Sequence, residues 1–492
     1  MIKIGLFSVA LLMAAGCRSS MDHTIQERSA RVREYIARET KSDAPGIQYL
    51  VCTPDSTLFS FANGSADLAS GRPLEEKTTM MIYSMSKTIT AAAVLQLVEQ
   101  GKIALDDPIS DYVSDLPYQK KITIRHLLAQ MSGIPNPIPL RWVHLVEEHP
   151  RFDEEASLRA ILRENGDLDF EPGEKYGYSN ISYWLLGKVI SKASGISYED
   201  YLRQSTFRRL KIPESEIDFV IPQRENHSKG YLPKWSFLNL FKSFVIDSRF
   251  VGEYEDGWLH INDHYLNGPA FGGIVATARA IGMFLQDQIS DSSKLFSTRT
   301  RQLFFEQQKA TDGTPVEMTL GWHIGQEEGV QFFFKEGGGG GFHAEMRIYP
   351  DQRIASVVIA NNTSFNVKKF LNTADREFFR KGSIDSVVQF LLTSAATDFH
   401  THGPSRPLRF RDVRLGSLAA ASGTKQYLLC GEALLREEGG KEVWIPFATI
   451  KTSGYEQWIG NQATAFCQGS SVVWEEAGDL SALLESRLDS LR

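Results

Sequence analysis

Apolar and polar positions along the chain predict strands on both sides of a long helical region. Residues 46–53 (GIQYLVCT) and 56–67 (STLFSFANGSAD) have the apolar, β-branched and aromatic composition of two strands joined as a hairpin. Strands are predicted again within residues 318–362, in MTLGWHIGQ, VQFFFKEG, HAEMRIYP and IASVVIANN. From residue 84 to about residue 306 the chain is predicted to be mostly helical, broken by glycine and proline loops.

This order of elements predicts an α+β fold. The economical arrangement is one antiparallel sheet built from both ends of the domain and flanked by helices, with the helical region as a second lobe. The amphipathic residues 21–39 and a segment from Asn366 to about Lys381 supply flanking helices. A binding site would then lie in the cleft between sheet and lobe.

A small β-rich module is predicted at the C-terminal end. Residues 397–407 (TDFHTHGPSRP) have the composition of a linker, and KQYLLCGEALL, KEVWIPFATI and SSVVWEE follow as short strands. The predicted boundaries are 18–382 for the main domain, 383–407 for a helix end and linker, and 408–492 for the module. Cys430 and Cys467 both fall in the module, and we expect them to form a disulfide in an oxidising compartment.

The first 17 residues, MIKIGLFSVALLMAAGC, have the pattern of a signal peptide. One lysine precedes an apolar run that is short for a membrane span, and small residues follow. The ending AAGC resembles a bacterial lipobox and predicts lipidation of Cys17; the alternative is an ordinary cleaved signal with a chance cysteine. Either reading predicts export, as a membrane-anchored lipoprotein or a periplasmic protein.

Charge and composition narrow the possible partners. The 492 residues carry a formal net charge of −7 and no basic run, which argues against nucleic acid as a partner. Cysteine and histidine spacings match no zinc pattern, and we expect no metal site. His144 and His149 in HLVEEH would point about 140° apart on a helix.

The candidate chemistry begins at YSMSK, residues 83–87, where a loop enters an apolar helix. Ser84 and Lys87 lie one turn apart and share a face. A helix N-terminus stabilises developing negative charge, and a lysine of lowered pKa can take the serine proton. The S-x-x-K pattern alone is weak, because about two chance matches are expected in a chain of this length. The second match, Ser422 and Lys425, lies in a glycine-containing turn with no helix after it.

Two further segments favour the S-x-x-K pattern at Ser84 over the one at Ser422. Tyr178 and Asn180 stand just before a predicted helix, where a hydroxyl and an amide could complete a proton relay; the Y-L-N at residues 265–267 has the same spacing. Lys335 ends a predicted strand and is followed by the run GGGGG. Glycines there would let a substrate backbone approach closely, although the run is equally typical of a flexible hairpin loop.

In order and spacing, these motifs over roughly residues 24–382 resemble the serine β-lactamase and penicillin-binding-protein superfamily. The similarity is to its class C-like branch, which includes esterases, D-aminopeptidases and carboxypeptidases. TIRHLLAQMSGIP, LDDPISDYV, GPAFGGIVAT and IANN also stand at family-like positions.

The resemblance implies a role for each matching residue. Ser84 would be the acylated nucleophile, Lys87 would assist its deprotonation, and Tyr178 would shuttle a proton. The residues implied to bind substrate are Asn180, Lys335, Gly337 and Gly338. The N–H groups of Ser84 and Gly338 would hold the oxyanion. No cofactor is implied.

One position departs from the family pattern. Glu336 stands where K-T-G has threonine, and an acidic side chain pointing inward would repel a substrate carboxylate. We therefore expect an exported serine hydrolase that cleaves ester or amide bonds of small substrates, peptides included. The alternatives are a cell-wall D,D-carboxypeptidase or β-lactamase, and an inert binding protein of the same fold. Oligomeric state is left open.

Overall fold

The computed structural model divides into two compact units: the first holds residues up to 325 and 331–378, and the second holds 326–330 and the residues from Phe379 onward. The structure describes residues 26–137, 142–235, 247–327, 330–379, 383–402, 407–419, 425–436, 440–452, 454–469, 472–475, 478–489 and 491. The predicted signal peptide and Cys17 lie outside the described residues.

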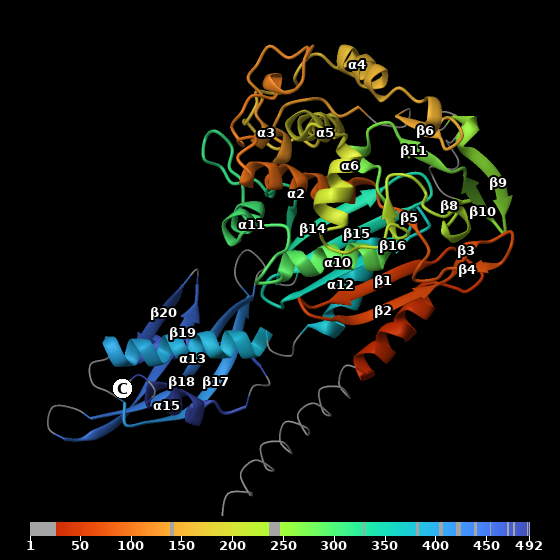
Figure 1. Cartoon of the computed structure of the whole chain (residues 1–492). Coiled ribbons are helices and arrows are strands. Elements are labelled where there is room, and N and C mark those ends of the chain that lie inside the picture. The colour runs from red at the N-terminus through yellow and green to blue at the C-terminus, as the bar shows by residue number, and fades with distance from the viewer. Residues whose placement is uncertain are drawn as a thin grey trace, which may run out of the picture. The chain divides into compact units, whose positions relative to one another are not determined.

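The first unit is built on a six-stranded sheet that confirms the predicted α+β fold (Figure 1). Its order is β13 (His323–Glu327), β14 (Val330–Gly338), β15 (His343–Tyr349), β16 (Ile354–Ala360), β1 (Ile47–Cys52) and β2 (Thr57–Asn63). β1 pairs with β16 antiparallel, with Ile47 opposite Ala360 and Leu50 opposite Val357. Strands from both ends of the domain therefore pair side by side in one sheet.

One face of the sheet packs against α10 (Ala278–Ile289). A Cβ at Gly282 of this helix would lie 2.7 Å from a methyl carbon of Leu50, so the glycine allows close packing. Cys52 is buried on the same side, and burial raises the pKa of its thiol to about 12. An unreactive core thiol fits this environment.

The opposite face is covered by the helical residues 26–39 and by α12 (Val367–Ala374). Tyr35 and Phe370 stack across these two helices, with ring centroids 5.4 Å apart. Just after α12, the buried carboxylate of Asp375 accepts hydrogen bonds from Tyr49 and Tyr349, both at 2.6 Å. These bonds offset the desolvation of a buried charge and tie the helix end to the sheet.

The second lobe surrounds α2 (Ser86–Glu99), and 12 of its 14 residues are buried. Its neighbours include α5 (Asn180–Ser194), α9 (Pro269–Gly272) and α11 (Thr298–Phe305). This region holds more strand than the sequence predicted. β6 (Val143–Leu145) pairs with β11 (His264–Leu266), and β8 (Gly230–Pro233), β10 (Trp258–Ile261) and β9 (Val251–Glu255) form a three-stranded sheet.

The second unit is a five-stranded sheet with helices, separate from the first. The strand order is β20 (Tyr455–Ile459), β19 (Glu442–Lys451), β18 (Lys425–Arg436), β17 (Arg409–Ala419) and β21 (Val473–Trp474). Figure 1 shows α13 (Ser383–Thr401) lying across this sheet. α15 (Ser481–Asp489) belongs to the same core.

Residues 383–407 were predicted as a helix end and a linker that starts at residue 397, and α13 extends over 383–401, into the first part of that linker. Apolar residues of this helix are buried at helical spacing and pack with Phe410 and Phe447 of the sheet. These buried residues are Val387, Val388, Leu391, Leu392, Ala395, Ala396 and Phe399. The polar, histidine-containing end of the segment favoured a linker, but the apolar stripe before it drives helix formation against the module.

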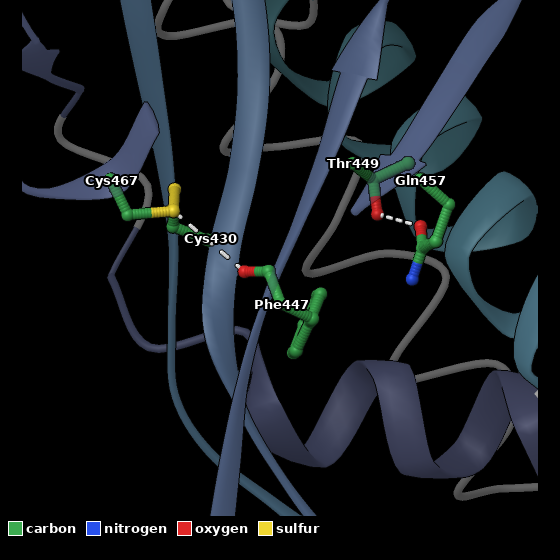
Figure 2. The surroundings of a disulfide bond; sticks show 5 residues. All are labelled: Cys430, Phe447, Thr449, Gln457 and Cys467. Atoms are coloured by element: carbon green, nitrogen blue, oxygen red, sulfur yellow. Dashed lines mark hydrogen bonds between the residues drawn. A yellow bond between two sulfur atoms is a disulfide. The ribbon is translucent and has the colours of Figure 1, made fainter. Parts of the chain in front are cut away.

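A disulfide joins Cys430 of β18 to Cys467 at the end of α14 (Asn461–Cys467), as Figure 2 shows. The two Cα atoms are 5.9 Å apart and the cysteines are 37 residues apart in sequence. On the loop-entropy model, closing a loop of this size stabilises the folded module by about 4 kcal/mol. Such a contribution is large for a core of fewer than 100 residues. Within the described residues, none of the helices is both long and apolar enough to cross a membrane.

Candidate active site

Ser84 lies in a tight turn that the structure holds from two sides. The 3-10 turn η1 (Tyr83–Met85) leads directly into α2, and Tyr83 has the left-handed φ of 43°. A non-glycine residue in that region costs about 1–3 kcal/mol, which surrounding contacts must offset. The hydroxyl of Tyr83 donates to the carbonyl oxygen of Gly340 at 2.6 Å. This bond fixes the turn against the glycine run, and it leaves Ser84 half-buried and reachable.

Lys87 is fully buried one turn further along, with three oxygen atoms around its amine. Its Nζ lies 2.6 Å from the carbonyl oxygen of Phe271, 2.7 Å from Asn180 Oδ1 and 3.0 Å from Ser84 Oγ. The first two oxygens can only accept a hydrogen bond. A neutral amine that donates to both of them therefore directs its lone pair at the hydroxyl of Ser84.

The surroundings of Lys87 favour that neutral form. Burial lowers the pKa of its amine well below the ordinary value, and the positive charge of Lys335 lowers it further. Burial likewise lowers the pKa of Lys335 to about 7. Two amines near one serine are thus poised to lose their protons under mild conditions.

Tyr178 and Asn180 are placed by the cap of α5. The Ser179 hydroxyl between them accepts from the N–H of Ser182, which caps the helix. The N–H of Ser179 donates to Gln130 Oε1 at 2.7 Å, which fixes the backbone of the cap. The two flanking side chains consequently point at the same place, Asn180 to Lys87 and Tyr178 to Ser84 Oγ, at 2.8 Å.

Tyr178 remains protonated in this environment. Burial raises the pKa of its phenol far above the ordinary value, and the hydrogen bond to Ser84 only partly opposes this. Its O–H therefore donates to Ser84 Oγ. A neutral phenol in this position can supply a proton, whereas a tyrosinate base is disfavoured.

Lys335 approaches the same centre from β14. Its side chain is fully buried, its Nζ lies 5.1 Å from the ring centroid of Tyr178, and the described residues give it no hydrogen-bond partner. A buried amine with unused donors is unfavourable unless something binds it. It is the group at this site best suited to receive a polar atom of a substrate.

Gly337 and Gly338 follow on opposite faces of β14. A Cβ on Gly337 would lie 2.1 Å from the carbonyl oxygen of Ile82 and 3.0 Å from the nitrogen of Ser84. Only glycine allows this strand to approach the Ser84 turn so closely. A Cβ on Gly338 would instead meet the ring of His343, on the other face of the strand.

The concern that Glu336 repels a substrate carboxylate is not supported by its orientation. Successive side chains of a strand point to opposite faces, so Glu336 points away from the side that Lys335 and Gly337 share. Its Oε1 lies 2.6 Å from His343 Nε2, and its side chain is 51% exposed. The alternation of side chains along the strand could have predicted this orientation from the sequence.

Other sequence candidates lie elsewhere. HLVEEH is no helix: His144 is on β6, His149 begins a 3-10 turn, and their Nε2 and Nδ1 atoms are 2.9 Å apart. Asn267, from the second Y-x-N pattern, bonds to His144 at 2.9 Å. Within the described part of the chain, no group of three or more His, Cys, Asp or Glu residues could hold a metal ion.

The sequence did not single out three contributors to the site. Tyr83 fixes the turn that carries Ser84, the carbonyl of Phe271 orients Lys87, and His323 lies beside Tyr178 with ring centroids 6.5 Å apart. The identity of Tyr83 gives no sign of its positive φ, and a main-chain carbonyl can come from any residue. His323 stands within the predicted strand MTLGWHIGQ, and no motif marks it.

Relatives of known sequence match part of the chain. Penicillin-binding protein 4* of Bacillus subtilis (strain 168) is 26% identical over 308 residues, which are 62% of this chain and 65% of that protein. Acyltransferase calJ of Penicillium decumbens is 28% identical over 273 residues, 52% of this chain and 62% of that protein. The chain therefore spans less than two thirds of the length of these curated relatives.

Solved structures share the fold. D-amino acid amidase from Ochrobactrum anthropi SV3 superposes with a TM-score of 0.56 at 20% identity, over 75% of this chain and 99% of that one. A class C β-lactamase gives 0.54 at 18% identity, over 72% and 95%. An octameric penicillin-binding protein homologue from Pyrococcus abyssi gives 0.55 at 17% identity, over 90% and 99%.

The family itself is shown by the sequence match. The family model described as Beta-lactamase matches residues 21–378, which include Ser84, Lys87, Tyr178 and Lys335. Because this match extends over most of the chain, the protein belongs to the β-lactamase family of serine hydrolases, together with the penicillin-binding proteins.

Proposed function

We propose that this protein hydrolyses ester or amide bonds of small substrates through an acyl-enzyme on Ser84. The observation that carries the proposal is the pair of short contacts to Ser84 Oγ, 3.0 Å from Lys87 Nζ and 2.8 Å from Tyr178 Oη. A base and an acid thus reach the same hydroxyl. That arrangement activates a serine and then protonates what leaves.

The chemical steps follow from these contacts. Neutral Lys87 takes the proton of Ser84 while Oγ attacks the substrate carbonyl. The N–H groups of Ser84 and Gly338 would hold the resulting oxyanion, because Gly337 brings β14 close to the Ser84 nitrogen. The tetrahedral intermediate then breaks its bond to the leaving group, which takes a proton from Tyr178. Lys87 returns its proton to Tyr178.

Deacylation repeats the sequence with water. A water molecule loses a proton to the Lys87–Tyr178 pair and attacks the acyl carbonyl. The bond to Ser84 Oγ then breaks, Oγ regains a proton, and the acid product leaves. Lys335 would bind a polar group of the substrate through its unused donors.

A second candidate is β-lactam hydrolysis or D,D-carboxypeptidase activity. The orientation of Glu336 favours it, because the carboxylate bonds to His343 and leaves the Lys335 side of the strand open to an anionic substrate. An inert binding protein is less compatible with the site. Burying two lysine amines beside a strained turn is unfavourable for folding, and such features are retained where they serve chemistry.

A substrate panel tests the proposal. Purified protein is assayed with 4-nitrophenyl butyrate, D-alanine 4-nitroanilide and nitrocefin, and labelled with a fluorophosphonate. We expect one covalent label per chain, on Ser84, and turnover of the ester. Nitrocefin turnover at a comparable kcat/KM would favour the second candidate. Labelling of no serine, with turnover of none of the three, would establish the inert alternative.

We also propose that the protein is exported and that Cys17 carries the lipid. The pattern of residues 1–17 and the Cys430–Cys467 disulfide support this, because disulfides persist in oxidising compartments. Protein purified from its native host should partition into detergent and show a diacylglyceryl mass on an N-terminal Cys17 peptide. A soluble protein with an unmodified N-terminus would refute lipidation but leave export open. An N-terminus at Met1 would refute both.

A further inference from the structure

Glu336 and His343 form a bonded pair on the back of the strand that carries Lys335. His343 Nε2 lies 2.6 Å from Glu336 Oε1, and its Nδ1 lies 2.7 Å from the carbonyl oxygen of Phe365. Both neighbours of the ring are acceptors, and a neutral imidazole has only one N–H. Hydrogen bonds at both nitrogens therefore require an imidazolium, which pairs with the half-exposed Glu336 carboxylate.

The charges around the pair support this assignment. Burial by itself would lower the pKa of His343, but the bond and charge of Glu336, the Phe365 carbonyl and Glu345 raise it above the ordinary value. The bond to His343 lowers the pKa of Glu336, and the positive charges of Lys368 on α12 and Arg347 on β15 lower it further, against the effect of burial. Each partner thus favours the charged form of the other.

The pair is positioned to hold the catalytic segment of β14. His343 is directly opposite Gly338 in the register of β14 and β15. Phe365, which anchors the other side of the imidazole, lies in the loop after β16. From the same loop, Thr363 donates to the carbonyl of Gly339 at 2.8 Å and accepts from the N–H of Gly341 at 2.7 Å. The glycine run is therefore braced, which argues against a flexible hairpin loop.

We propose that Glu336 and His343 are positioning residues, whose ion pair holds Lys335 and the Gly337–Gly338 backbone in place for the acylation of Ser84. This inference rests on the proposed function. The pair is complete only while His343 is charged, so it is present at low pH and lost as the pH rises through the raised pKa of His343, above about 6.5. Part of the decline of kcat/KM at alkaline pH would then come from deprotonation of His343.

The Glu336→Gln variant tests whether the hydrogen bond to His343 is sufficient or whether the charges of the ion pair are needed. A glutamine amide can donate to Nε2 of a neutral His343 while Nδ1–H still donates to Phe365, so the bridge re-forms without a charge. With 4-nitrophenyl butyrate, we expect kcat/KM at pH 6.5 within about threefold of wild type, and loss of the alkaline decline assigned to His343. Glu336→Thr removes the bridge at every pH, and we expect kcat/KM to fall about 10- to 100-fold.

The matched control is Glu164→Gln, an exposed carboxylate on α4 (Glu154–Glu164), which should leave the pH profile unchanged. Nitrocefin gives a second comparison wherever it is a substrate. Loss of positioning lowers ester and lactam turnover in equal proportion, whereas relief of a repulsion would raise lactam turnover alone. An unchanged alkaline decline in Glu336→Gln, or a selective gain for nitrocefin in Glu336→Thr, would overturn the inference.

The ionisation of His343 is measured directly by ¹⁵N NMR of the imidazole, with the resonance assigned from His343→Gln. We expect an imidazolium at pH 6.5 in wild type and a neutral ring in Glu336→Gln. A neutral ring in wild type would refute the ion pair. An intact ion pair in a protein that neither hydrolyses esters nor reacts with fluorophosphonate would show that the proposed function had failed instead.

Discussion

Ser84→Ala should abolish both ester turnover and covalent labelling. The acyl-enzyme needs an oxygen at this position, and no water molecule would be held and activated in the same way. Removal of a covalent nucleophile leaves only binding and oxyanion stabilisation, so we expect kcat to fall at least about 10³-fold. The measurement is the steady-state rate with 4-nitrophenyl butyrate, together with intact mass after treatment with fluorophosphonate.

The fold should tolerate this substitution. Ser84 is only half-buried, and its hydroxyl lies between Lys87 and Tyr178 rather than within the packed core. The matched control is Ser422→Ala, which removes the serine of the other S-x-x-K pattern and should keep both rate and label. Ser86 is a poorer control, because its fully buried hydroxyl accepts a bond from the N–H of Ile274. A labelled Ser84→Ala protein would exclude Ser84 as the nucleophile.

The residues of the site could be predicted because each has a local signal. Ser84 and Lys87 share one helical turn, and Tyr178 and Asn180 flank a helix cap, so short sequence windows contain them. Ser84 and Tyr178 are 94 residues apart, and only the family resemblance predicted that they lie in one site. Periodicity alone shows which face of an element is apolar but not which two elements meet.

The errors had physical causes that can be named. The polar composition of residues 397–407 predicts a linker, whereas an apolar stripe that includes Leu391, Leu392 and Phe399 continues α13 to Thr401. Residues 84 to about 306 are predicted to be mostly helical, but the structure places short strands there, including β6 and β11. The positive φ of Tyr83 has no signal in the sequence at all, because it is imposed by tertiary contacts.

The Lys87→Met variant should show whether Lys87 or Tyr178 accepts the proton of Ser84. Methionine has similar length and is compatible with a buried position, but it accepts no proton. General base catalysis contributes about 10²- to 10⁴-fold, so we expect kcat for the ester to fall by that factor. Lys192→Met, an exposed lysine on α5, is the control and should keep the wild-type rate.

Stability gives an independent readout of the same residue. Because the pKa of Lys87 is lowered on folding, the unfolded chain binds its proton more tightly, and the wild type gains stability as the pH rises toward the ordinary lysine value of about 10.4. The Lys87→Met variant lacks this pH-dependent contribution to stability. The Tm of wild type relative to the variant should therefore increase from pH 6 to pH 9, measured by thermal unfolding of the two proteins in parallel.

Together, the two measurements distinguish the possible bases. If Lys87 is the base, kcat falls by the expected factor in Lys87→Met, and the difference in Tm between wild type and variant varies with pH. A variant that keeps kcat within about tenfold of wild type would mean that Tyr178 accepts the proton of Ser84. That outcome would require a phenolate, and the burial of Tyr178 disfavours one. The raised pKa of this phenol, together with the two acceptors that orient the amine of Lys87, is the reason to expect the first result.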